Sequence, residues 1–153
     1  MQSFKIIKPI HILTPYVRYY WILEDGADVS VSERTLPTGC IQLVFHRGKR
    51  LLLVGKKESQ PQAFICGQCL NFSDVMSAGK IEMITVVFQP YAARAILQLP
   101  LKFFYGELIA VDAIADLELS ILSRKVIEAD DHETCIRLIE LFLIHRIYRF
   151  EGY

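Results

Sequence analysis

The sequence has no excess of charge of either sign. Seventeen lysines and arginines are balanced by seventeen aspartates and glutamates, which gives a formal net charge of zero at pH 7. Proteins that bind duplex DNA draw much of their affinity from basic side chains that neutralise phosphates. The charge balance therefore predicts that this chain does not bind DNA by itself.

Long hydrophobic runs are also missing. Runs such as Leu51–Val54 and Leu141–Ile144 fall far short of the roughly 20 residues that a membrane-spanning helix needs. The N-terminal residues lack the apolar core and small-residue cleavage site of a signal peptide. We therefore expect a cytoplasmic protein with no membrane association. With 153 residues, 52% of them hydrophobic, and no linker or internal repeat, the chain should form a single domain.

Motifs of catalysis and metal binding are sparse. The sequence contains no Gly-x-Ser-x-Gly elbow and no glycine-rich phosphate loop. The motif Cys66-Gly67-Gln68-Cys69 lacks the second pair of ligands that a zinc site requires, and the four histidines form no close pair. Four cysteines are too few for a disulfide scaffold in a domain of this size. These absences predict a protein that is not an enzyme and holds no metal or cofactor.

The most informative stretch that is present runs from Arg34 to Gly48. Pro37 and Gly39 favour a tight turn, and a strand follows them. Side chains alternate along a strand, so one face should carry Cys40, Gln42, Val44 and His46 and the other Ile41, Leu43 and Phe45. Both sets are largely apolar, which predicts a central strand covered on both faces. The polar break after His46 predicts a hairpin to a second strand at Leu51–Val54.

Strand patterns fill most of the first 89 residues, and helix patterns the rest. Aromatic and β-branched segments predict further strands at residues 16–24, 29–36, 63–68, 70–76 and 81–88, with residues 1–15 as an extended arm that lends an edge strand. Three helices are predicted: one at residues 91–97, a second that begins after a cap at Asp112, and a third that runs from a cap at Asp130 to about Tyr148. Residues 101–111 look irregular. The order predicts an α+β fold: an antiparallel barrel or sandwich at about residues 1–89, then two to three helices at about residues 90–149.

The two longer helices have different apolar patterns. The stripe of the first consists of Ile114, Leu117, Ile121 and Leu122. The last helix is apolar over an arc wider than one packed face needs. It lies either between two layers of its own fold or between this chain and another subunit. In the second case we expect a homodimer through the C-terminal helices, with an interface at Ile139, Phe142, Leu143 and Ile147.

A candidate ligand pocket is formed by aromatic and polar residues on the predicted strands. It consists of Trp21, Arg34, Gln42, His46, Phe64 and Gln68. If the strands close into a barrel, some of these side chains line its interior, and a few polar groups in an apolar cavity are typical of a small-molecule site. The alternative is a core filled by its own side chains, as in most small barrels. For His46 the alternatives are that it contacts a ligand or that it is a hydrogen-bonded structural residue.

Three motifs in order resemble a known family. They are Arg34-x-Leu36-Pro37-x-Gly39-Cys40-x-x-Leu43-Val44-Phe45-His46, Phe64-x-x-Gly67-Gln68 and Val87-Phe88-x-Pro90-x-Ala92-Ala93. Together with Tyr20-Trp21 and Leu99-Pro100-Leu101, they resemble the domain that precedes the DNA-binding part of AraC/XylS-type bacterial transcription regulators.

The resemblance implies a cupin-like β-barrel followed by helices, acting as the sensing or dimerising half of a regulator. In such proteins two helix-turn-helix motifs occupy a further stretch of roughly a hundred residues, which a single domain has no room for. We therefore expect DNA contact only through a C-terminal domain missing from this chain, and a small-molecule effector as a partner. The alternatives are a cupin-like metal-dependent enzyme and a structural interaction domain with a filled barrel.

Overall fold

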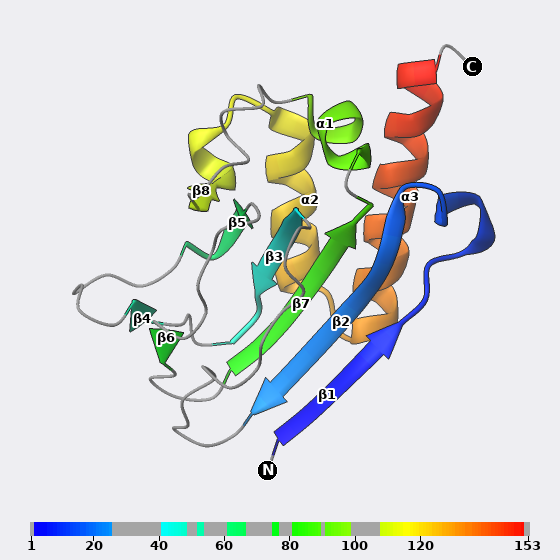
Figure 1. The fold of residues 1–153 in the computed structure, drawn as a ribbon. Coiled ribbons are helices and arrows are strands. Elements are labelled where there is room, and N and C mark those ends of the chain that lie inside the picture. The colour runs from blue at the N-terminus through cyan, green and yellow to red at the C-terminus, as the bar shows by residue number, and fades with distance from the viewer. Residues whose placement is uncertain are drawn as a thin grey trace.

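A computed structural model describes residues 2–25, 41–48, 52–53, 61–66, 75–76, 81–89, 91–98 and 108–151. The fold is α+β, with an antiparallel sheet and helices that pack against one of its faces (Figure 1). None of the helices within these ranges is long and apolar enough to cross a membrane.

Six strands form the main sheet, and each neighbouring pair is antiparallel. Their order across the sheet is β1 (Gln2–Ile7), β2 (Val17–Asp25), β7 (Ile81–Phe88), β3 (Gln42–His46), β5 (Ala63–Cys66) and β8 (Leu108–Ala110). In the described residues β1 and β8 are the two edges and do not pair with each other, so this sheet is open. The α+β fold, the N-terminal edge strand and the strand at residues 81–88 are confirmed.

Strand β3 lies at the centre, as its sequence predicts. It is buried along its whole length, and Leu43 and Phe45 join the core beneath the helices while Val44 joins a core on the opposite face. The predicted hairpin is wrong. Strand β3 pairs with β7 and β5, whereas β4 (Leu52–Leu53) pairs with β6 (Val75–Met76) in a separate two-stranded sheet. Both edges of β3 are occupied by strands from later in the chain. The strand predicted at residues 29–36 lies outside the described residues.

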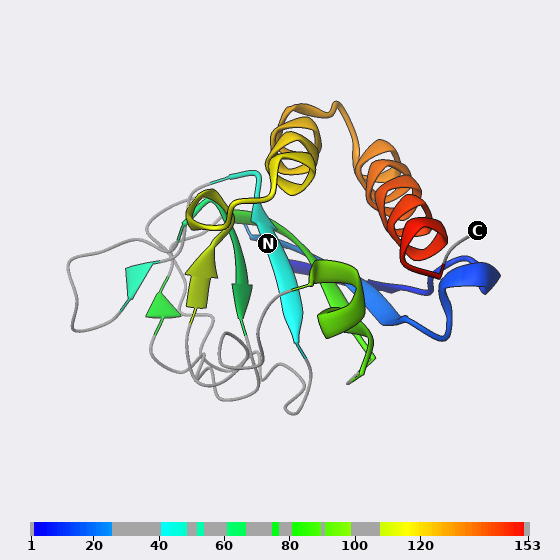
Figure 2. The same cartoon turned by 90° about the horizontal axis from the view of Figure 1, so that it is seen from above.

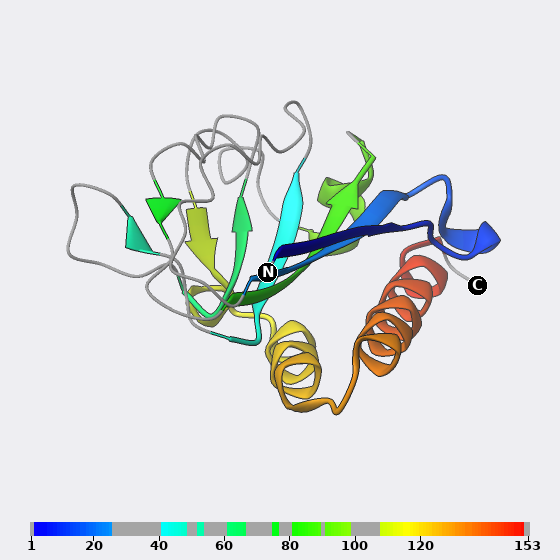
Figure 3. The same ribbon diagram turned by 90° about the horizontal axis from the view of Figure 1, so that it is seen from below.

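The helical layer consists of a short helix and a helical hairpin. Helix α1 is Ala92–Leu97, and the hairpin joins α2 (Leu117–Glu128) to α3 (His132–Glu151). Figures 2 and 3 show α2 and α3 side by side against one face of the sheet, which we call the helix face. Two 3-10 turns, His11–Leu13 and Val111–Ala113, complete the described elements. Strand β8 falls in the segment that the sequence predicts to be irregular.

The beginnings of both long helices differ from the sequence prediction. Helix α2 is capped by Asp116, whose Oδ1 accepts a hydrogen bond from Leu119 N at 3.1 Å, and not by Asp112. Helix α3 is capped by Asp131, which accepts from Thr134 N at 2.7 Å, one residue after the predicted cap. Each cap satisfies an amide that has no partner within its helix.

The later start of α2 changes which of its residues are buried. Leu117 is 75% exposed and Ile121 is 40% exposed, although the sequence places both in the apolar stripe. The buried residues are Leu119, Leu122, Ser123 and Val126. Only Leu122 of the predicted stripe therefore faces the core from this helix.

Helix α3 buries three of the four side chains that the sequence assigns to a dimer interface. Ile139 and Leu143 have no exposed surface and Ile147 is 7% exposed, and all three belong to the core of this chain. Phe142 is half-buried, and the guanidinium of Arg146 lies 4.7 Å from its ring centroid. Ile139, Leu143 and Ile147 are therefore occupied by their own fold, while the homodimer through the C-terminal helices stays a prediction. A partner that met α3 would contact the other face of the helix.

Candidate functional site

The face of the sheet opposite the helices, which we call the opposite face, gathers the predicted pocket residues. Trp21 on β2 is the register partner of Thr85 on β7, which in turn is opposite Val44 on β3, and Val44 is opposite Phe64 on β5. Gln42 and His46 lie two residues on either side of Val44 and share its face. All of these side chains are at most 2% exposed. The structure therefore brings four predicted residues together, while Arg34 and Gln68 lie outside the described residues.

Three buried polar atoms on this face have no hydrogen-bond partner within the described part of the chain. They are Trp21 Nε1, Gln42 Oε1 and Thr85 Oγ1. A polar atom that is buried without a partner costs about 1–3 kcal/mol, so native proteins seldom keep several together. Trp21 on β2 and Thr85 on β7 are directly opposite each other on neighbouring strands, and Gln42 on β3 is diagonal to Thr85. We call these three residues the polar cluster.

The described residues packed around the polar cluster are apolar. The buried residues packed on this face are Trp21, Leu23, Val44, Phe64, Cys66, Ile81, Met83 and Val87. The ring of His46 lies 5.7 Å from that of Phe64, centroid to centroid. Burial raises the pKa of the Cys66 thiol to about 12, which keeps it protonated and unreactive at neutral pH. The cluster thus offers one donor, one acceptor and one hydroxyl that can do both, and the described core residues of this face carry no charge.

Thr85 is the residue of this site that sequence analysis missed. It occupies a strand of β-branched and apolar residues, where a threonine is explained by strand propensity alone. Only its pairing with Trp21 identifies it. No group of three or more His, Cys, Asp or Glu side chains that could hold a metal ion occurs in the ranges that the structure describes.

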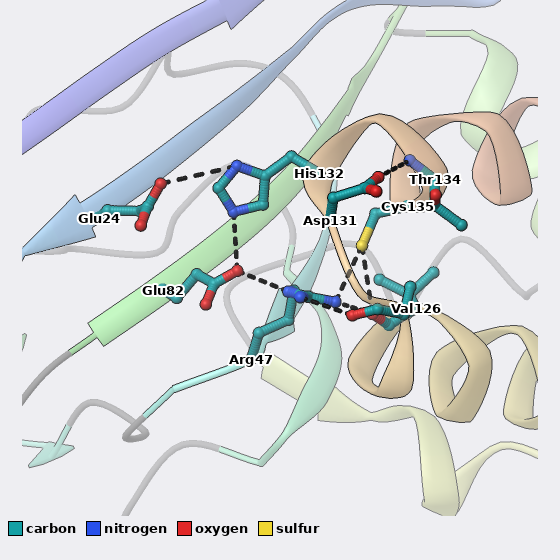
Figure 4. A network of polar contacts seen from close by, with 9 residues as sticks. Glu24, Arg47, Glu82, Val126, Asp131, His132, Thr134 and Cys135 are labelled. Atoms are coloured by element: carbon teal, nitrogen blue, oxygen red, sulfur yellow. Dashed lines mark hydrogen bonds and ion pairs between the residues drawn. The ribbon is translucent and has the colours of Figure 1, made fainter.

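A second set of polar contacts ties the sheet to the helical hairpin (Figure 4). Arg47 directly follows β3, and its side chain is 10% exposed. Its Nε donates to Glu82 Oε2 at 2.6 Å, its Nη1 to Val126 O at 2.5 Å and its Nη2 to Ala129 O at 2.8 Å. These two carbonyls lie at the C-terminal end of α2. Backbone oxygens at this end of a helix lack partners within the helix and carry the negative end of its dipole. Arg47 therefore caps α2 and fastens it to β3 and β7.

The same contacts include the first turn of α3. His132 Nε2 lies 2.7 Å from Glu82 Oε2, and its Nδ1 lies 3.6 Å from Glu24 Oε1. Arg47 Nη1 also lies 3.0 Å from Cys135 Sγ. Burial raises the pKa of the Cys135 thiol, with Arg47 partly opposing it. Burial alone would raise the pKa of Glu82 as well, but hydrogen bonds from Arg47 and His132 outweigh it and lower that pKa.

The contribution of Glu82 to stability should therefore disappear in acid. Its pKa is lower in the folded state, so the contribution is present above the ordinary glutamate pKa of about 4.3 and is lost as the pH falls through the lowered value. Glu82→Gln should reduce the free energy of unfolding at neutral pH, and the difference from wild type should shrink at about pH 3. Urea unfolding at both pH values measures this, with exposed Glu128→Gln as the control. A difference that does not change with pH would contradict the assignment.

A third polar group joins all three helices. Arg146, which is 6% exposed, donates from Nη1 to Ile96 O at 3.1 Å and from Nη2 to Asp116 Oδ1 at 2.6 Å. Burial would raise the pKa of Asp116, but the hydrogen bonds from Arg146 and Leu119 N lower it. A surface cavity of about 450 Å³ lies beside this pair. Its basic and acidic side chains already pair with each other, as Arg149 does with Glu118, so this group is explained by helix packing.

Fold and site define the class of this protein: an α+β domain whose antiparallel sheet carries helices on one face and a buried polar cluster on the other. A family model described as "Domain of unknown function (DUF6597)" matches residues 5–110, and the chain belongs to this family. The match spans the strands of the main sheet, the polar cluster and Arg47, and ends before α2. Comparisons with curated proteins and with solved structures found no match.

Proposed function

We propose that this chain is the ligand-sensing domain of an AraC-type transcription regulator, and that a small neutral molecule binds at the polar cluster. The observation that carries the proposal is the group of three buried polar atoms, at Trp21, Gln42 and Thr85, that have no hydrogen-bond partner among the described residues. A ligand with one acceptor and one donor would satisfy them, and the uncharged surroundings favour a neutral one. The motif resemblance supplies the regulator family.

Closure of the sheet into a cupin-like barrel belongs to this proposal. The described helices pack on the helix face, yet the side chains of the opposite face are also buried, as the interior of a barrel requires. A barrel interior would place His46 and Phe64 in the wall around the ligand. The rival hypotheses are a structural domain with a filled interior and a metal-dependent enzyme of similar shape.

A route from the ligand to the helices follows from the strands themselves. Gln42 and His46 lie on β3, which Arg47 directly follows, and Thr85 shares β7 with Glu82, three residues away. A shift of either strand on ligand binding would move the Arg47–Glu82 pair and, through it, the junction of α2 and α3. In the regulator hypothesis this junction sets how two copies present their separate DNA-binding domains. Exposed α3 residues such as Leu141 and Tyr148 would take the place of the buried ones in a helical interface.

Thr85→Val tests the site. The change keeps the shape but removes the hydroxyl, so the unliganded protein should be as stable as wild type or more stable by about 1 kcal/mol. Its melting temperature should no longer rise with neutral compounds that stabilise wild type, because a hydrogen bond to the ligand is lost. Thermal shift against a panel of neutral sugars, lactones and aromatic alcohols measures both effects.

Thr14→Val is the matched control, because Thr14 is exposed and hydrogen-bonds locally to His11 O at 2.8 Å. It should leave the ligand response unchanged. Native mass spectrometry of the purified chain adds an independent measurement: a co-purified small molecule supports the proposal, whereas a stoichiometric metal supports the enzyme hypothesis. Clear destabilisation of unliganded Thr85→Val would mean that the hydroxyl is already satisfied, and the proposed site would be abandoned.

A further inference from the structure

Strand β1 has the features of an edge strand that pairs with a strand of another chain. It lies at one end of the sheet, and no described strand occupies its outer side. Its six residues run against β2 in an unbroken register, without a bulge. Natural edge strands are usually protected by charges, prolines, bulges or short length. Here Lys5 is the one charged residue, whereas Phe4 is 41% exposed and Ile6 is 58% exposed.

We propose that β1 pairs antiparallel with β1 of a second copy of this chain, about a two-fold axis at Phe4, so that two sheets become one. This register places Phe4 directly opposite Phe4 of the second copy, and aromatic cross-strand pairs are favourable. It also places Lys5 opposite position 3 of the second copy, so the two lysines are not directly opposed. The edge is therefore complementary to itself, which a two-fold interface requires.

The other edge of the sheet is a poor alternative partner. Strand β8 has three residues, Leu108–Ala110, against six in β1. Pairing of β1 with β8 of a second copy would leave half of β1 uncovered. It would also be a head-to-tail contact, which forms rings or filaments instead of a closed dimer. Pairing of like edges covers five of the six residues of β1, Gln2 to Ile6, and forms a closed dimer.

Charges next to β1 also favour a second copy. A groove of about 380 Å³ lies between β1 and α3, and Lys5, Ile7, Glu133 and Arg137 are among its lining residues. Figure 3 shows α3 running beside β1 and β2. The two-fold axis reverses the direction of α3 in the second copy, an arrangement that would let Glu133 of one copy pair with Arg137 of the other. Both side chains are exposed, 86% and 69%, and within the described residues they contact each other at 3.5 Å.

Disulfide trapping tests the register. Opposed residues in an antiparallel pair have Cα atoms about 4.5–5.5 Å apart, within the range of a disulfide. Phe4→Cys should therefore form a covalent dimer under mild oxidation. Ile6→Cys is the matched control, since position 6 is on the same face and more exposed. Its two Cα atoms would be separated by four residues of strand, roughly 13 Å, and should not be linked.

Charge exchange tests the contact without a covalent bond. Phe4→Lys and Phe4→Glu should each raise the dimer dissociation constant by roughly tenfold or more, because like charges are opposed at the axis. An equimolar mixture of the two should recover a heterodimer, which native mass spectrometry resolves. Near-ultraviolet circular dichroism checks that each variant is folded. Recovery in the mixture excludes misfolding as the cause of dissociation.

Leu141→Lys separates this interface from a helical one, because Leu141 is 60% exposed on α3. The dimer should survive this change. A wild-type chain that is monomeric in sedimentation, or a dimer that Leu141→Lys dissociates and the Phe4 variants do not, overturns the proposal. Equal crosslinking at positions 4 and 6 overturns the register. None of these measurements involves a ligand, so failure here is distinct from failure of the proposed sensing function.

Discussion

Leu143→Ala should lower the free energy of unfolding by about 2–5 kcal/mol, whereas Leu141→Ala should change it by about 0.5 kcal/mol or less. The two leucines are two residues apart on α3 but lie on different faces of the helix. Leu143 has no exposed surface and packs in the core with Ile139, while Leu141 is 60% exposed. Truncation of the buried leucine loses its transfer free energy and leaves a cavity. Urea unfolding of both variants, with equal slopes against urea, measures the difference.

The same pair of variants tests whether Leu143 on α3 packs in the core of its own chain or contacts another subunit. The width of its apolar arc, taken from the sequence alone, allows Leu143 to contact another subunit. In that case Leu143→Ala would weaken association and leave the unfolding of a monomer nearly unchanged. A large loss of stability in Leu143→Ala that does not depend on protein concentration would support the packing described above.

Arg47→Met should be among the most damaging polar substitutions in this protein. It leaves Glu82 partly buried without this guanidinium and removes the guanidinium as a donor to the carbonyls of Val126 and Ala129, although the Cys135 thiol still donates to Val126 O at 3.3 Å. Removal of one partner from a buried charge pair costs about 3–5 kcal/mol, and we expect about 3 kcal/mol because Glu82 is 23% exposed and keeps His132. Urea unfolding measures the loss. Arg124→Met is the matched control, since Arg124 is exposed on α2, and it should have little effect.

The double variant Arg47→Met with Glu82→Gln identifies the cause. If the loss arises from an orphaned carboxylate, the second change should recover part of the stability that the first removes, and the two effects will not add. Additive losses would mean that Arg47 acts mainly through the two carbonyls of α2. Hydrogen exchange at the end of α2 distinguishes these cases, because loss of the cap should increase exchange there.

The sequence determined features that depend on neighbours along the chain. Alternation from Ile41 to His46 sets which side chains share a face of β3, because the pleat is a local property of any strand. For the same reason Gln42 and His46 could be assigned to one face before their surroundings were known. Strand β7 and helix α1 were likewise predictable from local patterns, the strand at residues 81–88 and the short helix before Pro100.

The tertiary structure decided everything that depends on distant segments. Both Asp112 and Asp116 are able to cap a helix locally, but Asp116 also binds Arg146, 30 residues later. Arg47 contacts carbonyls 79 and 82 residues away, and no local pattern encodes those contacts. Thr85 belongs to the polar cluster only because β7 pairs with β2. Burial and pairing are set by which surfaces meet, so the sequence could fix the faces of β3 but not what each face contacts.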